Sequence, residues 1–201
     1  MKPRFAWLLT LGAAIACTVA APSPPSRQQP TLYERIALKL ARDPRLAQRL
    51  AMPPAELERA KWLLGQWEVS ARVFATASTP ERRSQGSSRI DQALGKAWIR
   101  FDDTYADGSD LTFLTFNAIT QRWVSVTIDG TGNAVTTQGT GSIDHRLVFT
   151  GPPVSIVGET VRLRQTMEKR SDGEFHVLNE ERLADGRWVA LDEYSYRKKR
   201  P

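Results

Sequence analysis

Trp62-Leu63-Leu64-Gly65-Gln66-Trp67-Glu68-Val69 is the stretch that decides the fold, because the spacing of apolar residues changes inside it. Before Gly65, residues 55–64 place apolar side chains three and four positions apart, which is the period of one helix face. From Trp67 onward, apolar and polar residues alternate, which is the period of a β-strand with two unlike faces. Gly65 lies where a helix commonly ends. The sequence therefore predicts a helix that leads directly into the first strand of a sheet and can plug one end of it.

Downstream of this stretch, the chain carries hairpin signals in place of helical periodicity. The dipeptide Asp-Gly begins at Asp107, Asp129, Asp172 and Asp185, each time between alternating or β-branched runs, which predicts β-hairpins. Ten strands are predicted, at 66–76, 85–94, 97–105, 110–117, 122–129, 134–141, 145–150, 160–170, 174–183 and 187–197.

The short connections between these strands favour an up-and-down antiparallel meander. Closure of the meander into a barrel removes the two exposed edges that an open sheet would leave. The predicted fold class is therefore mainly β, a barrel of about ten strands with an N-terminal helical extension. A β-sandwich is the alternative.

The first twenty residues have the form of a secretory signal peptide. Lys2 and Arg4 make a positive region, residues 5–19 are mostly apolar, and the small residues Ala20 and Ala21 follow. We therefore expect an exported protein, located in the periplasm of a bacterial envelope.

Cys17, the single cysteine, lies within this segment. Cleavage after Ala20 would discard it. The run Ala14-Ile15-Ala16-Cys17 resembles a bacterial lipoprotein box, and cleavage after Ala16 would instead make Cys17 a lipidated N-terminus. In both cases the folded part contains no disulfide, so its stability must come from its own core.

Three segments follow the signal peptide. Residues 21–30 contain four prolines and no large apolar residue, which predicts an extended tether. Residues 31–64 predict three short helices: Thr31 to Glu34 has capping-box spacing, Asp43-Pro44 joins an N-cap to a proline at the first helical position, and Pro53-Pro54 begins the third. Residues 65–201 are predicted to form the barrel domain.

The formal net charge of +6 is spread among acidic residues, except for the run Arg197-Lys198-Lys199-Arg200. Because the chain has no basic–aromatic module, nucleic acid is not expected as a partner. The basic run predicts either a solvated tail or contact with an anionic membrane surface. A lipidated Cys17 would be a second route to a membrane.

Gly65-Gln66-Trp67 resembles the Gly-x-Trp opening of lipocalins and their calycin relatives. In those folds the tryptophan lies at the closed end of the barrel, and a basic residue of the last strand packs over it. The resemblance implies a calycin-like barrel in which Gly65, Trp67 and Arg197 are structural, with Arg197 packed over Trp67.

Residues 60–197 are also similar to the uncharacterised DUF1579 family of bacterial proteins. The matching segments are Leu63 to Trp67, Leu94 to Trp98, Phe116 to Trp123, and Tyr196-Arg197. Lys96 departs from the family's pattern, and the helical lead-in is additional. The family has no assigned reaction, so the resemblance implies a fold and no activity.

The sequence shows no strong catalytic or metal signature. No histidine or cysteine pair has zinc-ligand spacing, no Gly-x-Ser-x-Gly elbow is present, and Asp102-Asp103 places its carboxylates on opposite faces of a strand. We therefore expect neither an enzyme nor a metal or cofactor site, although an unpaired acid in the cavity would change that expectation. Ten-stranded haem barrels, the nitrobindins, use one histidine near the C-terminus as an iron ligand, and this resemblance implies His176 for that role.

Mixed strand faces are the main indication of a ligand cavity. In strands 122–129 and 187–197 neither face is purely apolar, which a partly polar cavity would tolerate. If Trp98 points inward, Arg100 does too and needs an anionic partner. The candidate ligand-binding residues are Trp98, Arg100, Trp123, His176 and Tyr194. We expect a barrel that binds a small apolar or amphipathic ligand; the alternative is a structural or envelope-interaction protein with a filled barrel.

Overall fold

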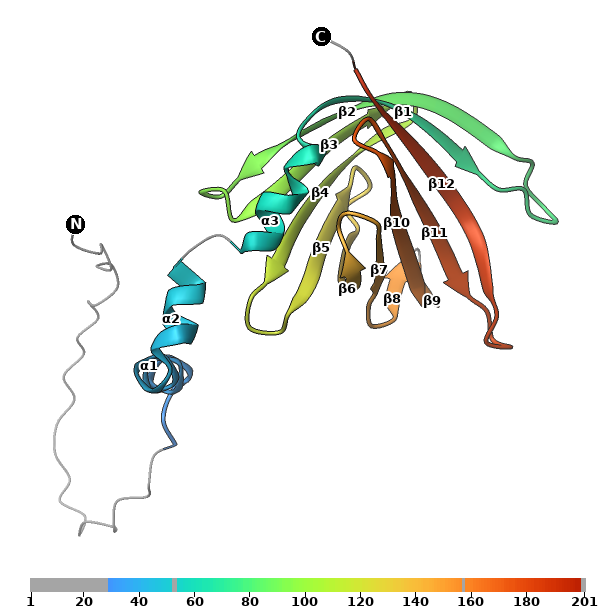
Figure 1. Ribbon diagram of the computed structural model, residues 1–201. Helices are drawn as coiled ribbons and strands as arrows, with labels where there is room; N and C mark the ends of the chain where they lie inside the picture. Colours follow the sequence, from blue (N-terminus) through green and yellow to red (C-terminus); the bar gives the residue numbers. More distant parts are fainter. Residues whose placement is uncertain (1–28, 52–53, 157, 200–201) are drawn as a thin grey trace, which may run out of the picture. The chain divides into compact units, whose positions relative to one another are not determined.

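The computed structural model of the chain describes residues 29–51, 54–156 and 158–199. The chain divides into two compact units, Met1–Arg42 and Asp43–Pro201 (Figure 1). The predicted signal peptide, Cys17 and the tether up to residue 28 lie outside the described residues and stay predictions.

Helix α1 (Leu32–Arg42) forms most of the described part of the first unit. It begins at the predicted capping box, where the Glu34 carboxylate accepts hydrogen bonds from the Thr31 backbone N–H at 2.7 Å and from its hydroxyl at 2.9 Å. No side chain of this helix is buried. Its cap and its own sequence, and not a packed core, therefore stabilise α1.

Short helical segments open the second unit. Helix α2 (Pro44–Ala51) begins at Asp43, whose Oδ1 accepts the Leu46 N–H at 2.9 Å. Helix α3 (Ala55–Arg59) continues into the 3-10 helix η1 (Ala60–Leu63). The predicted three helices are confirmed, with the last turn of the third tightened to the 3-10 form. None of the described helices is both long enough and apolar enough to cross a membrane.

Ten antiparallel strands close into a barrel in the order β1-β12-β11-β10-β7-β6-β5-β4-β3-β2. Their bounds are β1 Gly65–Val73, β2 Arg82–Ala93, β3 Trp98–Tyr105, β4 Gly108–Asn117, β5 Arg122–Asp129, β6 Ala134–Ser142, β7 Arg146–Thr150, β10 Leu163–Ser171, β11 Glu174–Arg182 and β12 Trp188–Lys198. Pairing of β12 with β1 closes the ring (Figure 1). The predicted up-and-down barrel is confirmed.

A two-stranded hairpin lies between β7 and β10 and is separate from the barrel. Its strands are β8 (Val154–Ile156) and β9 (Glu159–Val161). No strand was predicted at β8, and the predicted strand 160–170 joined β9 to β10. Both strands have only three residues, which is too short for the alternation of polar and apolar side chains to identify them.

The helical lead-in contributes to the core of the barrel. Leu57, Ala60 and Leu63 belong to the same buried cluster as Trp67. The Trp67 indole Nε1 donates a hydrogen bond of 2.7 Å to the Leu63 carbonyl, and its ring packs edge-on against Phe175 at 4.9 Å. The helix that runs into β1 therefore packs against the barrel core, and the expectation that it plugs one end of the barrel stays a prediction.

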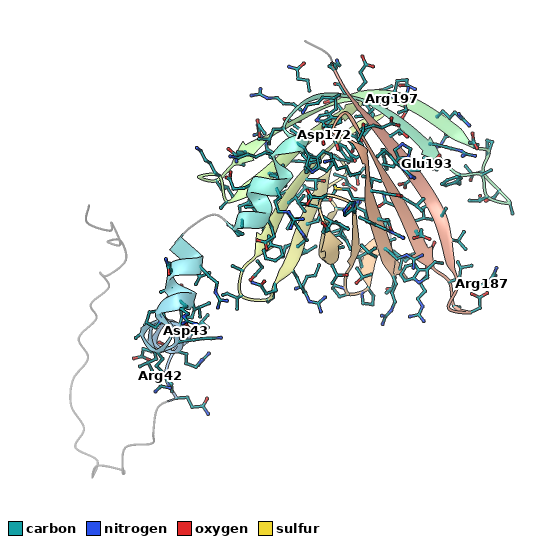
Figure 2. The ribbon with its side chains drawn as sticks, in the orientation of Figure 1. Arg42, Asp43, Asp172, Arg187, Glu193 and Arg197 are labelled. Atoms are coloured by element: carbon teal, nitrogen blue, oxygen red, sulfur yellow. The ribbon has the colours of Figure 1, made fainter. Side chains whose placement is uncertain are left out.

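A lysine, and not the predicted arginine, covers Trp67. Lys198 Nζ lies 5.3 Å from the Trp67 ring centre and donates a hydrogen bond of 3.0 Å to the Trp62 carbonyl. The prediction of Arg197 was wrong by one residue, and the Arg197 side chain is 74% exposed near the C-terminal end of β12 (Figure 2). Side chains alternate along a strand, so Lys198 shares the face of the buried Tyr196 while Arg197 faces outward.

Candidate functional site

A cavity with a volume of about 90 Å³ lies inside the barrel. One part of its lining is apolar and consists of Phe101, Leu114, Phe149, Met167 and Val177. The rest is polar and consists of Asp103, Tyr105, Asp110, Thr112, Ser125, Thr127, Gln165, Asn179, Tyr194 and Tyr196. The cavity therefore offers an apolar surface and a set of hydrogen-bonding groups to one occupant.

Alternation along β3 sets which of its side chains reach the cavity. Phe101, Asp103 and Tyr105 line it, whereas Asp102 and Thr104 between them are exposed. Tyr105 directly precedes the β3–β4 turn, so the polar lining lies toward that turn. The two-residue turn pairs Tyr105 with Gly108, and this register places Asp110 opposite Asp103.

Asp103 is the most deeply buried acid of the cavity, with 4% of its surface exposed. Its Oδ2 accepts a hydrogen bond of 3.0 Å from the Tyr196 hydroxyl. Among the described residues, its Oδ1 accepts no hydrogen bond of good geometry, although the buried hydroxyl of Ser88, opposite on β2, lies close enough to lower the pKa of the carboxyl. Burial raises the pKa of Asp103 to about 6.

Two more carboxylates belong to this region. Burial and the charge of Asp129 raise the pKa of Asp110 above its ordinary value. Burial also raises the pKa of Asp192 to about 6, against a hydrogen bond of 2.7 Å that its Oδ1 accepts from Asn179. Gln165 in turn donates a hydrogen bond of 3.1 Å to Asn179. Above about pH 6, Asp103 and Asp192 therefore bring negative charge to the cavity region.

Two tyrosines flank the acids. The rings of Tyr105 and Tyr194 lie 5.8 Å apart at an interplanar angle of 52°. Burial raises the pKa of both phenols well above the ordinary value, so both are neutral at physiological pH. They offer hydroxyl groups and ring faces, and no charge.

Of the five predicted ligand-binding residues, the cavity contains one, Tyr194. Trp123 faces the interior but lies in the filled core, 2% exposed and 5.5 Å edge-on from Phe116. Its strand brings Ser125 and Thr127 to the cavity in its place.

The placement of Trp98 and Arg100 in the cavity was wrong. Both lie on the outer face of β3, because Ile99 and Phe101 are the buried residues of this strand. Arg100 pairs with Asp91 through hydrogen bonds of 3.1 Å and 2.7 Å, and its side chain is 35% exposed. The required anionic partner is thus a neighbouring aspartate and not a ligand.

The placement of His176 in a ligand site was also wrong. It lies between the buried residues Phe175 and Val177, so it faces outward, and its side chain is 38% exposed. Its Nε2 lies 3.1 Å from the Glu174 carboxylate. This position gives no support to the haem role implied by the nitrobindin resemblance. Among the described residues, no group of three or more histidine, cysteine or acidic side chains is arranged to hold a metal.

A β-bulge explains why β12 appeared mixed on both faces. Asp192 pairs with Asn179 but Ala190 pairs with Glu180, which leaves Leu191 as an extra residue. The bulge moves Trp188 to the outer face, where Arg164 stacks over it at 4.4 Å. Alternation counted through Leu191 therefore assigns the wrong face to one end of the strand.

The three acids of the cavity region were not predicted as site residues. In the sequence, Asp102 and Asp103 alternate between opposite faces of a strand, which argued against a shared site for the two carboxylates. The available signal was the Asp107-Gly108 turn, since a short hairpin fixes register and pairs Asp103 with Asp110 across it. A second signal was that Asp192 shares one face of an alternating run with the aromatic residues Tyr194 and Tyr196.

Comparisons with known proteins add little to this geometry. No protein-family model matches the chain, so the resemblance to the DUF1579 family is not confirmed. No curated protein matches it. Among solved structures, it is similar to a protein of unknown function of the DUF3598 family from Nostoc punctiforme PCC 73102, with 8% identity and a TM-score of 0.23, over 72% of this chain and 99% of that chain. Values this low carry no argument about function, and the barrel assignment rests on strand order and closure.

Proposed function

We propose that the protein is a binding protein that holds a small amphipathic molecule inside its barrel. The observation that carries this proposal is the cavity itself. It is lined by apolar side chains on one part of its surface and by polar side chains on the rest. A side-chain core that only stabilised the fold would favour apolar contacts throughout, because burying polar groups costs free energy unless they are paired. Asp103 Oδ1 and the tyrosine hydroxyls give the polar part of a ligand something to bind.

The cavity volume limits the ligand to a small one. Ligand pockets for drug-sized molecules measure roughly 300–1,000 Å³, and a dry apolar cavity of about 150 Å³ holds benzene. A cavity of about 90 Å³ suits a molecule of only a few heavy atoms, or one end of a longer molecule.

Native mass spectrometry of the mature protein, purified from its own envelope, tests this proposal. We expect an added mass that leaves on denaturation. Val177→Phe, which fills the cavity, should abolish the added mass, and Leu178→Phe on the opposite face of β11 should retain it. A bare protein over repeated preparations, or an added mass that survives Val177→Phe, would count against the proposal.

A structural or envelope-interaction protein with a filled barrel is the second candidate. The small cavity volume favours it. The dense packing of the aromatic core favours it as well, since none of its four large side chains is more than 2% exposed: Trp67, Trp123, Phe149 and Phe175. Under this hypothesis the added mass is absent and crosslinking in the envelope captures a protein partner.

A proton-transfer enzyme is a weaker candidate, favoured by one observation. Asp103 has an oxygen without a partner and a pKa of about 6, close to the value that suits a general acid or base at neutral pH. We place binding ahead of catalysis because the described residues that line the cavity include no histidine, cysteine or lysine to act with Asp103.

Export and membrane attachment are proposed from the sequence of residues 1–20 and from the basic C-terminal run alone. The mass of the mature N-terminus distinguishes the two processing routes. Cleavage after Ala20 gives an unmodified chain, whereas cleavage before Cys17 gives a chain with the added mass of lipid. A lipidated chain would supply the membrane contact directly.

A further inference from the structure

The cavity combines an unpaired buried acceptor with an excess of negative charge. Asp103 Oδ1 has no partner among the described residues although the side chain is 4% exposed and lines the cavity. Asp110 lines the same cavity, and Asp192 lies beside it. Among the described residues of the lining, none is lysine, arginine or histidine. The protein therefore brings carboxylates into its interior without supplying a cation for them.

The neighbouring amides do not satisfy Asp103. Gln165 donates to Asn179, and Asn179 donates to Asp192, so this chain of hydrogen bonds ends on a different carboxylate. Ser88, the residue opposite Asp103, has a buried hydroxyl close enough to lower the pKa of the carboxyl, but this group is neutral and offers a single proton. A buried charged acceptor without a donor costs free energy, and a ligand that donates to it recovers that cost.

The surroundings of the unpaired oxygen select a positively charged donor. An anion would meet like charge from Asp103 and Asp110, and a quaternary ammonium has no N–H to donate. A protonated amine provides both a charge and donors, and the faces of Tyr105 and Tyr194 also favour a cation. The apolar lining can then hold the carbon chain of the amine.

We propose that the cavity binds a primary ammonium group, so that the ligand is a small aliphatic amine held by Asp103. This inference rests on the proposed binding function and assigns its ligand class. The ammonium donates to Asp103 Oδ1, while the hydrogen bond from Tyr196 keeps the carboxylate in position through Oδ2.

The test compares three probes of equal chain length on the full chain at pH 7.5: n-butylammonium, n-butanol and butyrate. Binding is measured by NMR titration of the cavity residues. We expect n-butylammonium to bind about tenfold more tightly than n-butanol, and butyrate to bind more weakly than both. In Asp103→Asn the ammonium should lose about tenfold in affinity while n-butanol changes little. Asp102→Asn, an exposed neighbour on the opposite face, is the matched control and should leave all three unchanged.

Acidification provides a second readout. The titratable groups around Asp103 are Tyr105 on β3, Asp110 on β4, and Asp192, Tyr194 and Tyr196 on β12, with the exposed Asp102 beside it. The phenols stay neutral below pH 8, so protonation of carboxyls governs this range. Affinity for n-butylammonium should fall as the pH drops from 7.5 to 5, and affinity for n-butanol should not follow it.

The outcomes separate the two proposals. Equal binding of n-butanol and n-butylammonium, or an ammonium affinity that Asp103→Asn leaves unchanged, would overturn the ammonium assignment and leave the binding function standing. If Asp103→Asn does not fold, the ranking of the three probes on the native chain decides the matter. Failure of the binding function itself is detected independently, by the absence of any added mass that Val177→Phe removes.

Discussion

The Tyr196 hydroxyl donates a 3.0 Å hydrogen bond to Asp103 Oδ2 across the interior of the barrel, since β1 and β2 lie between their strands in the barrel order. The same tyrosine stacks on Phe175 with ring centres 4.2 Å apart and planes 10° apart. One side chain thus connects the packed aromatic core to the acid that lines the cavity. The orientation of Asp103 is set by the core and not by a surface loop.

Tyr196→Phe should therefore destabilise the protein in a pH-dependent way. The substitution keeps the stacked ring but leaves a buried carboxylate without a donor, at a cost of about 1–3 kcal/mol at pH 7.5. The loss should be smaller at pH 5, where Asp103 is largely protonated. Urea unfolding at the two pH values measures it. Tyr33→Phe, on a tyrosine that is 82% exposed, should change neither value, and an equal loss at both pH values would contradict the assigned role of the hydrogen bond.

Asp103 should also make stability fall as the pH rises. Its pKa is raised from an ordinary 3.8 to about 6 in the folded chain, so the folded state keeps a proton that the unfolded state has already lost. The stabilisation is complete below about pH 4 and is lost as the pH passes through about 6.

Asp103→Asn removes this titration. Relative to Asp103→Asn, the native chain should lose on the order of 2 kcal/mol of unfolding free energy between pH 4 and 7.5, at about 1.4 kcal/mol per unit of pKa shift. Asp192 titrates in the same range in both proteins and so largely cancels from the difference. Parallel stability curves for the two proteins would show that Asp103 has no raised pKa.

Trp67→Ala should remove a large part of the stability. The side chain is fully buried, donates to the Leu63 carbonyl and packs on Phe175, so its loss should cost about 3–5 kcal/mol. Trp98→Ala on the outer face is a control with the same change in size and should cost about 1 kcal/mol. Guanidinium unfolding of both variants compares them, and a near-native midpoint for Trp67→Ala would remove the argument from the Gly-x-Trp motif.

The sequence predicted the barrel well because its signals are local. Turn dipeptides and alternation act within a few residues, and each Asp-Gly marks a hairpin whose strands pair as expected. The capping contacts of Thr31 and Asp43 are local for the same reason, and both are confirmed.

The candidate site was predicted poorly because local sequence does not determine which face of a strand points into the barrel. In β3 the two faces each carry an aromatic residue and an acid, Trp98 with Asp102 and Phe101 with Asp103, so composition does not decide which face is inward. Contact with the rest of the core decides it, through packing of Phe101 near Phe175 at 6.5 Å. In β12 the bulge at Leu191 changes the face partway along the strand, which no period-two pattern reveals.

Lys198→Met should destabilise the protein and Arg197→Met should not. Lys198 donates to the Trp62 carbonyl and lies over the Trp67 ring, contacts that together contribute about 1 kcal/mol. Arg197 is mostly exposed and lies 3.9 Å from Glu174, which makes a surface ion pair of small value. Thermal unfolding of the two variants measures the difference. A larger loss for Arg197→Met would restore the assignment that the lipocalin resemblance implied.

Gly139→Ala tests how tightly the cavity is packed around Phe149, one of its lining residues. Gly139 lies on β6 between Trp123 and Phe149, its partners on the neighbouring strands. A Cβ at this position would lie 2.6 Å from two carbons of the Phe149 ring, so the ring must move. Overpacking of this kind costs about 1–3 kcal/mol, and because Phe149 lines the cavity, ligand binding should weaken together with stability.

Gly108→Ala is the matched control, because a Cβ there meets nothing within 4 Å. Chemical unfolding and the added mass in native mass spectrometry should both be close to native for Gly108→Ala, and both reduced for Gly139→Ala. If Gly139→Ala loses stability but keeps its ligand, the Phe149 ring is not part of the binding surface and the ligand lies closer to the acids. If it loses neither, the barrel relaxes around the added methyl group, and the Phe149 ring moves more easily than its close contact with Gly139 indicates.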